Sequence, residues 1–156
     1  MDIEFRVINF EDFEETKNFL IVNEYSWRDS DPQNYLEKTE EQITEFTSKF
    51  LKAVNRAPEK YRGFGAFRGD LLVGSQSLEI QIIDGRKACH IHGLWVDSTC
   101  RGNGIAKKLK LMGEVWAKEK QCDFMDTNVK VSNEPMKSLN QKPVSYTHLT
   151  LPTTPY

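Results

Sequence analysis

The chain of 156 residues has no uninterrupted apolar run near the roughly 20 residues that span a bilayer. Its first residues, MDIEFRVINFEDFEE, are acidic and lack the apolar core of a secretory signal. Neither sign of charge is in excess, because 21 basic residues stand against 23 acidic ones and the net charge is −2. This composition offers no general attraction for nucleic acid or for an anionic membrane surface. We therefore expect a cytoplasmic protein that binds neither.

Cysteine is scarce, and the chain contains only Cys89, Cys100 and Cys122. An odd number without a C-x-x-C pair does not describe a disulfide framework, so we expect reduced thiols. His90 and His92 have the spacing of a chelating pair, but no third ligand stands at a diagnostic distance from them. The sequence therefore predicts no metal site.

Two common nucleotide-binding patterns are also missing from the most distinctive stretch, CRGNGIAKKL at 100–109. The Rossmann fingerprint needs a third glycine after Gly102 and Gly104, where this chain has Lys107, and the P-loop motif is absent. The stretch does combine a strand-like run at 91–96, two glycines and the start of a helical pattern. Glycines let a bulky group approach the backbone, and a helix N-terminus favours an anion. We predict a diphosphate held by main-chain amides.

Hydrophobic periodicity predicts one domain with the element order β-α-α-β-β-β-α-β-α, a mixed α/β or α+β fold. Asn9 is expected to cap the first helix, and a polar turn at 26–34 should separate it from the second. Turns at Gly69-Asp70 and Asp84-Gly85 should join three strands into an antiparallel meander. The expected strands cover 3–10, 61–69, 71–84, 87–97 and 122–131, and the expected helices cover 9–25, 35–55, 105–120 and a last one from Ser132 or Asn133.

The glycine stretch carries a family resemblance. Arg101-x-x-Gly104-x-Ala106 resembles the Q/R-x-x-G-x-G/A signature of the GNAT family of N-acetyltransferases. The strand GLWVDSTC precedes it and an amphipathic helix follows, as in that family. SNEPMKSLNQK at 132–142 resembles the next family segment, N-x-x-M-x-x-L-N-x-K. The resemblance implies a GNAT-like acyl-CoA N-acyltransferase fold, whose mixed sheet splits in a V between its fourth and fifth strands.

The same resemblance implies a reaction. Acetyl-CoA would be the cosubstrate, no metal would take part, and the acetyl group would pass directly to a primary amine of a small molecule, peptide or protein. The cofactor-binding residues that the resemblance implies are Leu94, Trp95 and Val96 on the strand, Arg101, Gly102, Asn103, Gly104, Ile105 and Ala106 on the loop and helix, and Asn133.

An ammonium group must lose a proton before it can attack a thioester, so a base is needed. A strand period of two puts His90 and His92 on one face together with Leu94 and Val96. His90 stands where some family members carry a catalytic glutamate, and an imidazole titrates near neutral pH. Glu79, on the neighbouring strand, is the second catalytic candidate. Transfer of the proton through water remains open.

The C-terminal end departs from the family pattern. Many members carry a tyrosine on the last helix that protonates the departing thiolate, and Asn140 stands there in this chain. Residues 144–156 contain no Asp, Glu, Lys or Arg, and they resemble translated sequencing-adapter sequence. We therefore expect a C-terminally truncated acetyltransferase domain at 1–143, with the last strands missing, and a non-native tail at 144–156. A non-catalytic acyl-CoA-binding module or an inactive fragment is the alternative, and a homodimer is left open.

Overall fold

The protein is an α+β fold built on one mixed sheet, described by a computed structural model over residues 2–129 and 153–155. The strands follow one another in the sheet in chain order, from β1 to β6. The expected order of elements up to the fifth strand is confirmed, with one additional short helix. The elements are β1 (Glu4–Val7), α1 (Phe13–Asn23), α2 (Tyr25–Ser30), α3 (Glu40–Arg56), β2 (Tyr61–Arg68), β3 (Leu71–Ile83), β4 (Arg86–Val96), α4 (Ile105–Glu119), β5 (Phe124–Val129) and β6 (Thr153–Pro155).

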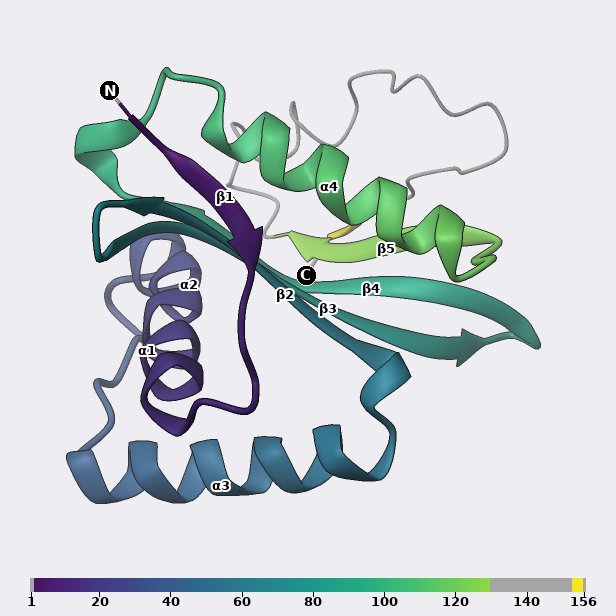
Figure 1. Ribbon diagram of the computed structural model, residues 1–156, viewed down its shortest axis with the longest axis horizontal. Coiled ribbons are helices and arrows are strands. Elements are labelled where there is room, and N and C mark those ends of the chain that lie inside the picture. Colours follow the sequence, from purple (N-terminus) through teal and green to yellow (C-terminus); the bar gives the residue numbers. More distant parts are fainter. Residues whose placement is uncertain (1, 130–152, 156) are drawn as a thin grey trace.

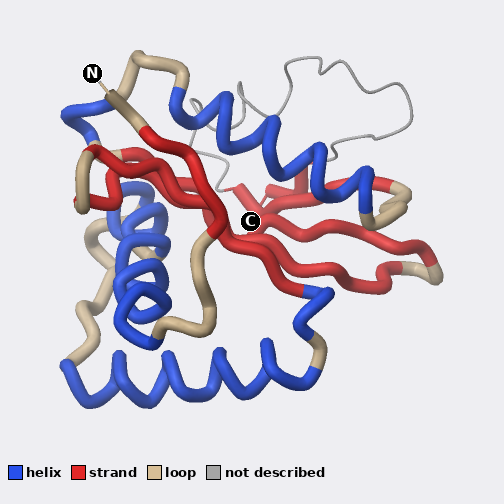
Figure 2. Tube along the Cα trace, viewed as in Figure 1, coloured by secondary structure: helices blue, strands red, loops and turns tan. Residues whose placement is uncertain are grey.

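The sheet lies between α4 on one face and α1, α2 and α3 on the other (Figures 1 and 2), and each face carries its own hydrophobic core. Helix α4 covers one face, where Ile105, Leu109 and Trp116 pack against inward side chains of β2 to β5. Helices α1, α2 and α3 lie on the other face, where Phe19 and Leu20 pack against strand residues that include Trp95. The two faces therefore have different neighbours, and the face on which a strand residue lies decides which of them it meets.

The three central strands form the expected antiparallel meander. Strand β2 pairs with β3, and β3 pairs with β4. Gly69 has φ 63°, and Asp84 and Gly85 have φ 51° and 74°, so both predicted turns use the left-handed backbone region that hairpins favour. The meander brings Glu79 of β3 directly opposite His90 of β4.

Strands β4 and β5 are parallel and separate part of the way along β4. Their pairing runs from Ala88↔Phe124 to Ile91↔Thr127, whereas β4 continues to Val96. Among the described residues, the last part of β4 therefore has no strand paired on its β5 side. This is the V-shaped opening between the fourth and fifth strands that the family resemblance implied.

The N-terminal helices differ from the prediction in detail. The N-cap of α1 is Asp12, which accepts from the Glu15 N–H at 3.0 Å, and not Asn9, whose side chain accepts from Glu11 within the preceding turn. The polar stretch 26–34 is not simply a turn, because most of α2 lies in it.

The second predicted helix starts later than its hydrophobic pattern indicated. Thr39 caps α3 in a capping box with Gln42, so the helix begins at Glu40. Leu36, which was expected on the buried face of this helix, lies outside it and is 79% exposed. The capping box competes successfully with the pattern, because it satisfies two backbone N–H groups at that position.

A β-bulge in β4 overturns another prediction. Ser77 and Leu78 are consecutive on β3, but their partners on β4 are Gly93 and Ile91, so His92 is the extra residue. The bulge shifts the alternation by one residue. Leu94 and Val96 consequently pack with Ile91 on the α4 side. The prediction that they share a face with the histidines is wrong.

The C-terminal predictions lie mostly outside the described residues. This applies to the helix from Ser132, to Asn133 and Asn140, and to the tail up to residue 152. Thr153–Pro155 form β6, which pairs in parallel with β5 from Thr127 to Val129. Three residues of the segment predicted to be a non-native tail thus pair with β5, and its predicted origin stays a prediction.

Candidate active site

The glycine loop joins the free end of β4 to α4. It contains a short 3-10 turn at Ser98–Cys100, followed by Gly102 and Gly104 at φ 83° and 76°. No heavy atom lies within 4 Å of a Cβ built on either glycine. The side-chain amide of Asn103 donates to the Cys100 carbonyl at 3.0 Å and fixes the turn. Residues 101–104 are all exposed, so the loop offers its backbone to a ligand from outside.

The N-terminus of α4 is left without a side-chain cap. Gly104 is its N-cap, whereas α1 and α3 are capped by Asp12 and Thr39. The amide of Lys108 donates to the Gly104 carbonyl at 3.0 Å, which begins the helical pattern. The amides of the first turn before it have no carbonyl inside the helix to bind. Together with the helix dipole they favour an anion at this position.

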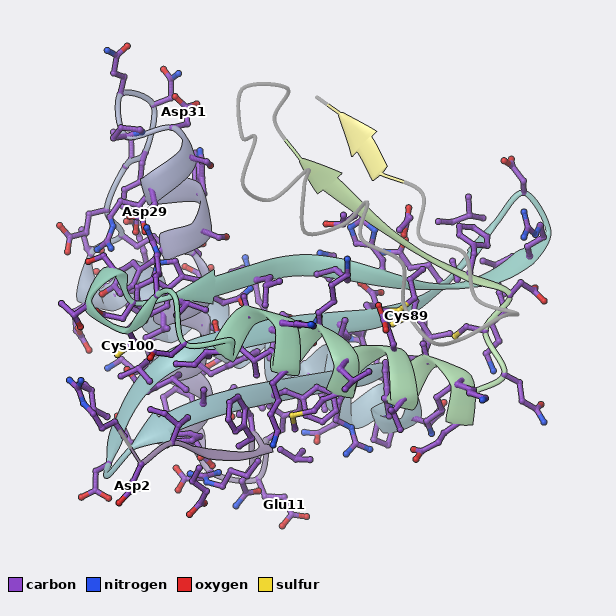
Figure 3. All side chains as sticks on the ribbon, turned by 90° about the horizontal axis from the view of Figure 1, so that it is seen from above. Asp2, Glu11, Asp29, Asp31, Cys89 and Cys100 are labelled. Carbon is purple, nitrogen blue, oxygen red and sulfur yellow. The ribbon has the colours of Figure 1, made fainter. Side chains whose placement is uncertain are left out.

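Arg101 is turned away from the loop's open side and connects it to α2. Its Nε donates to the Val96 carbonyl at 2.9 Å, and its Nη2 donates to Asp29 Oδ2 at 2.9 Å. The same Asp29 oxygen accepts from Trp95 Nε1 at 2.8 Å. Figure 3 labels Asp29 on α2 and Cys100 at the same end of the sheet, with Cys89 far along it.

The charge on Asp29 is favoured by these contacts. Burial alone would raise the pKa of the Asp29 carboxyl, but hydrogen bonds from Trp95 and Arg28, the Arg28 charge and a hydrogen bond from Arg101 lower it below its ordinary value. The carboxylate therefore stays ionised and links the end of β4, the glycine loop and α2 into one unit.

A cavity of about 470 Å³ lies on the α1–α3 side of the sheet. Its floor is formed by Ser77, Glu79 and His92, which lie just where β4 and β5 part. The other lining residues come from the helices and from the start of β2, and they are Leu20, Asn23, Glu24, Ser26, Trp27, Phe46, Phe50, Ala53 and Tyr61. The cavity and the glycine loop therefore lie along the same half of β4.

Glu79 and His92 form a hydrogen-bonded pair in the floor of this cavity. His92 Nε2 lies 2.7 Å from Glu79 Oε1. Since a carboxylate only accepts, the neutral imidazole carries its proton on Nε2 and has its lone pair on Nδ1. Tyr61 also hydrogen-bonds Glu79, and burial together with this carboxylate raises the pKa of the tyrosine. The arrangement can accept a proton from a group held in the cavity.

His90 lies behind this pair. Its Nδ1 is 2.9 Å from Asp126 Oδ1 on β5, and its ring centroid is 4.7 Å from that of His92. His90 is not among the residues that line the cavity. The two predicted bases, His90 and Glu79, are therefore brought close together, but only Glu79 faces the open space.

The backbone positions predicted for the cofactor adjoin one another. Leu94, Trp95 and Val96 are buried side chains on the unpaired part of β4, and this strand runs directly into the loop that contains Arg101 to Gly104. Ile105 is buried in the α4 core, which leaves its backbone as the part available at the helix start. Asn133 lies outside the described residues.

Sequence reasoning missed three participants in the site. His92 was treated as a neighbour of His90, because its hydrogen bond to Glu79 depends on the register between β3 and β4, which has no local sequence signal. Asp29 and Tyr61 reach the site through contacts across the fold, with Trp95 and Glu79 respectively. The acidic run around Asp29 was visible in the sequence, but its partners were not.

Residues 2–129 and 153–155 hold no group of three or more His, Cys, Asp or Glu side chains that could bind a metal ion. None of the helices described is long and apolar enough to cross a membrane. All three cysteines are buried and outside any disulfide.

Comparisons with solved structures show the same fold. A predicted acetyltransferase from Clostridium acetobutylicum, solved with acetyl-CoA, is 13% identical with a TM-score of 0.70, covering 92% of each chain. An aminoglycoside acetyltransferase from an uncultured soil metagenomic sample is 13% identical with a TM-score of 0.67, covering 94% of this chain and 96% of its own. Glucosamine-6-phosphate N-acetyltransferase from Arabidopsis thaliana is 14% identical with a TM-score of 0.66, covering 94% and 95%.

The family assignment comes from the sequence itself. Among curated proteins no sequence matches the chain. The sequence model of the acetyltransferase (GNAT) family matches residues 13–145, which include the cavity-lining helices, the meander and the glycine loop. The chain belongs to the acetyltransferase (GNAT) family.

Proposed function

We propose that this protein is an acetyl-CoA-dependent N-acetyltransferase that moves an acetyl group directly to a primary amine. The observation that carries the proposal is the unpaired end of β4, which leads straight into the glycine loop and the uncapped N-terminus of α4. A thioester with a long polar arm and a diphosphate needs both features side by side. The cytoplasm, where thiols stay reduced, is the compartment we propose for it.

The cofactor would lie along the split of the sheet. We assign the diphosphate to the amides of Arg101, Gly102, Asn103, Gly104, Ile105 and Ala106, with Leu94, Trp95 and Val96 supplying backbone partners for the arm and Asn133 acting near the thioester. The left-handed glycines and the exposed loop support this assignment. Acetyl-CoA supplies the activated acetyl group, and the chain's own residues hold it and move the protons.

The reaction would convert a primary ammonium and the thioester into an amide, CoA thiol and one proton. A primary ammonium loses one proton to the Glu79–His92 pair, and the amine lone pair attacks the thioester carbonyl carbon. The new C–N bond forms and the C–S bond breaks, with the electron pair leaving on sulfur. A second N–H proton is released and one proton reaches the thiolate, giving the amide, free CoA thiol and one net proton.

The base assignment develops the two predicted residues. Glu79 would orient His92, whose Nδ1 faces away from that hydrogen bond and can take the proton. His90 would act through His92, since its ring packs against that imidazole and its Nδ1 is held by Asp126. We treat His90 as a positioning residue that keeps the His92 ring in place.

Calorimetry with acetyl-CoA, followed by incubation with a panel of primary amines, tests the proposal on the full chain. We expect binding, release of CoA thiol and an acetylated amine detected by mass. Failure to bind acetyl-CoA would overturn the proposal. Binding without transfer to any amine would leave an acyl-CoA-binding module in place of an enzyme.

The base assignment has its own test. Glu79→Gln and His92→Gln should lower kcat by about 10²- to 10⁴-fold, as expected when a general base is removed. His90→Gln should lower kcat less and leave the acidic limb of the pH–rate profile in place. If His90→Gln removes that limb and His92→Gln does not, His90 is the base.

A further inference from the structure

We propose that the acceptor of this enzyme is a small primary amine with a single positive charge on a compact apolar body, of the arylalkylamine kind. The proposal rests on the proposed function and names the substrate class of the cavity between the sheet and α1, α2 and α3.

The walls of the cavity are mainly apolar. Leu20, Phe50 and Ala53 line it together with Trp27 and Phe46. Trp27 and Phe46 are 43% and 41% exposed, although large aromatic side chains usually bury most of their surface. An apolar ligand body in the cavity would cover them. Its volume of about 470 Å³ lies in the range of sites that hold one small molecule.

The carboxylates that line the cavity favour a ligand with one positive charge. Two carboxylates line it, Glu24 and Glu79, but Glu24 already forms an ion pair with Lys38. Glu79 accepts hydrogen bonds from Tyr61 and His92, and His92 has to be uncharged to take a proton from the substrate, so neither partner cancels the carboxylate charge in the reactive form. One carboxylate is thus left to attract a ligand cation. A polycation would find no second such partner among the described lining residues.

The same walls disfavour two other kinds of amine. None of the described residues that line the cavity is lysine or arginine, and Lys38 beside it is already paired with Glu24, so the lining offers a phosphorylated or carboxylated substrate no cationic partner of its own. A body covered with hydroxyl groups could reach Asn23, Ser26 and Ser77, but it would still bury part of its hydroxyls against Phe46, Phe50 and Ala53. Each buried hydroxyl without a partner weakens binding.

The single charge lies at the correct end for the reaction. Glu79 and His92 form the floor, beside the point at which β4 and β5 separate. An ammonium bound to Glu79 therefore lies next to the split assigned to the thioester. It would lose its proton to His92, while its apolar body extends toward Trp27 and Phe46.

Matched probes test the proposal on the full chain saturated with CoA. 2-Phenylethylamine should bind, and 2-phenylethanol, which has the same body without the charge, should bind more weakly by about tenfold or more. With acetyl-CoA, kcat/KM for 2-phenylethylamine should exceed that for methylamine, glucosamine 6-phosphate and kanamycin by at least about tenfold, from burial of the ring. Calorimetry gives the affinities and thiol release the rates.

Variants separate the two parts of the argument. Glu79→Gln should remove the preference for 2-phenylethylamine over 2-phenylethanol in binding. Phe46→Ser should reduce the advantage of 2-phenylethylamine over methylamine. Phe13→Ser is the matched control, because Phe13 is also an exposed phenylalanine, at 36%, and does not line the cavity. It should leave both ratios unchanged.

The outcomes distinguish this proposal from the proposed function. If acetyl-CoA binds but 2-phenylethylamine does not, or if kanamycin or glucosamine 6-phosphate is the better substrate, the substrate class is wrong and the enzyme assignment stands. Preference for a lysine-containing peptide over 2-phenylethylamine would also overturn it. If acetyl-CoA itself does not bind, the proposed function has failed first.

Discussion

The role of the glycine loop can be tested at Gly104, the residue that caps α4 in the left-handed region with φ 76° and ψ 12°. Replacing it by alanine places a Cβ in a conformation that costs an L-residue roughly 1–2 kcal/mol. No protein atom lies within 4 Å of that Cβ, so no clash adds to this cost. For a chain of this size the melting temperature should fall by about 2–8 °C.

The effect of Gly104→Ala on acetyl-CoA should be larger than its effect on stability. The added methyl group points into the open space where we assign the diphosphate, and it holds that group away from the amides of the first turn. Losing one hydrogen bond to a charged group costs about 1.5–3 kcal/mol. The dissociation constant for acetyl-CoA should therefore rise about 10- to 150-fold.

Gly85 offers a matched control for this prediction. It has φ 74°, with nothing within 4 Å of an added Cβ, and it lies in the hairpin between β3 and β4. Gly85→Ala should lose as much stability as Gly104→Ala and bind acetyl-CoA like the wild type. Thermal melts and calorimetry on both variants give the two quantities. Equal affinity of both variants for acetyl-CoA would refute the role of the glycine loop in binding the diphosphate. Unequal melting temperatures would refute the cost assigned to the left-handed backbone.

Three other predictions concern residues that support the glycine loop and helix α4. Asp29→Asn should lower the unfolding free energy by about 1 kcal/mol, because it weakens the link to Arg101. The pKa of Asp29 is lowered in the folded protein, so the difference in unfolding free energy between wild type and variant, measured in denaturant melts, should persist at neutral pH and disappear in acid. Burial lowers the pKa of Lys110 from 10.5 to about 8. Between pH 8 and 10.5 the unfolded chain therefore binds more protons than the folded one, and the unfolding free energy of the wild type relative to Lys110→Met should rise by about 3 kcal/mol. Urea titrations at successive pH values measure this rise. Gly74→Ala should cost about 1–3 kcal/mol in urea unfolding, because its Cβ would lie 3.0 Å from Ile105 on α4, and no loss would show that the helix can move away.

The sequence predicted those parts of the fold whose causes are local. Left-handed residues at Gly69 and Gly85 bend the chain into the two hairpins, where Gly-Asp and Asp-Gly are typical turn pairs. The glycine loop was equally visible, because a strand pattern ends and a helical pattern begins around Gly102 and Gly104. Turn residues and hydrophobic periodicity act within a few residues, so the elements that they determine can be predicted from the sequence alone.

The helix α2 was missed because its causes are distant in the chain. The stretch from Ser26 to Asn34 is rich in polar residues and contains Asp31-Pro32, a composition typical of a turn. Asp29 reaches Trp95 and Arg101, more than sixty residues away, and these contacts hold the short helix against the sheet. Tertiary contacts of this kind override a weak local preference, and no pattern in the sequence announces them.

The bulge at His92 shows why the strand period did not predict which side chains of β4 share a face. Leu94, Trp95 and Val96 are all buried, so the last part of β4 carries no alternation that could reveal the shift. Only the pairing with β3, where Gly93 and Ile91 oppose consecutive residues, defines it. Beyond His92, which contacts Glu79, the bulge turns Leu94 and Val96 to the α4 side. His92 follows Ile91, the last residue of β4 that pairs with β5, so the bulge and the opening of the sheet coincide. A strand that kept its period would place Leu94 and Val96 on the face of the histidines, away from α4.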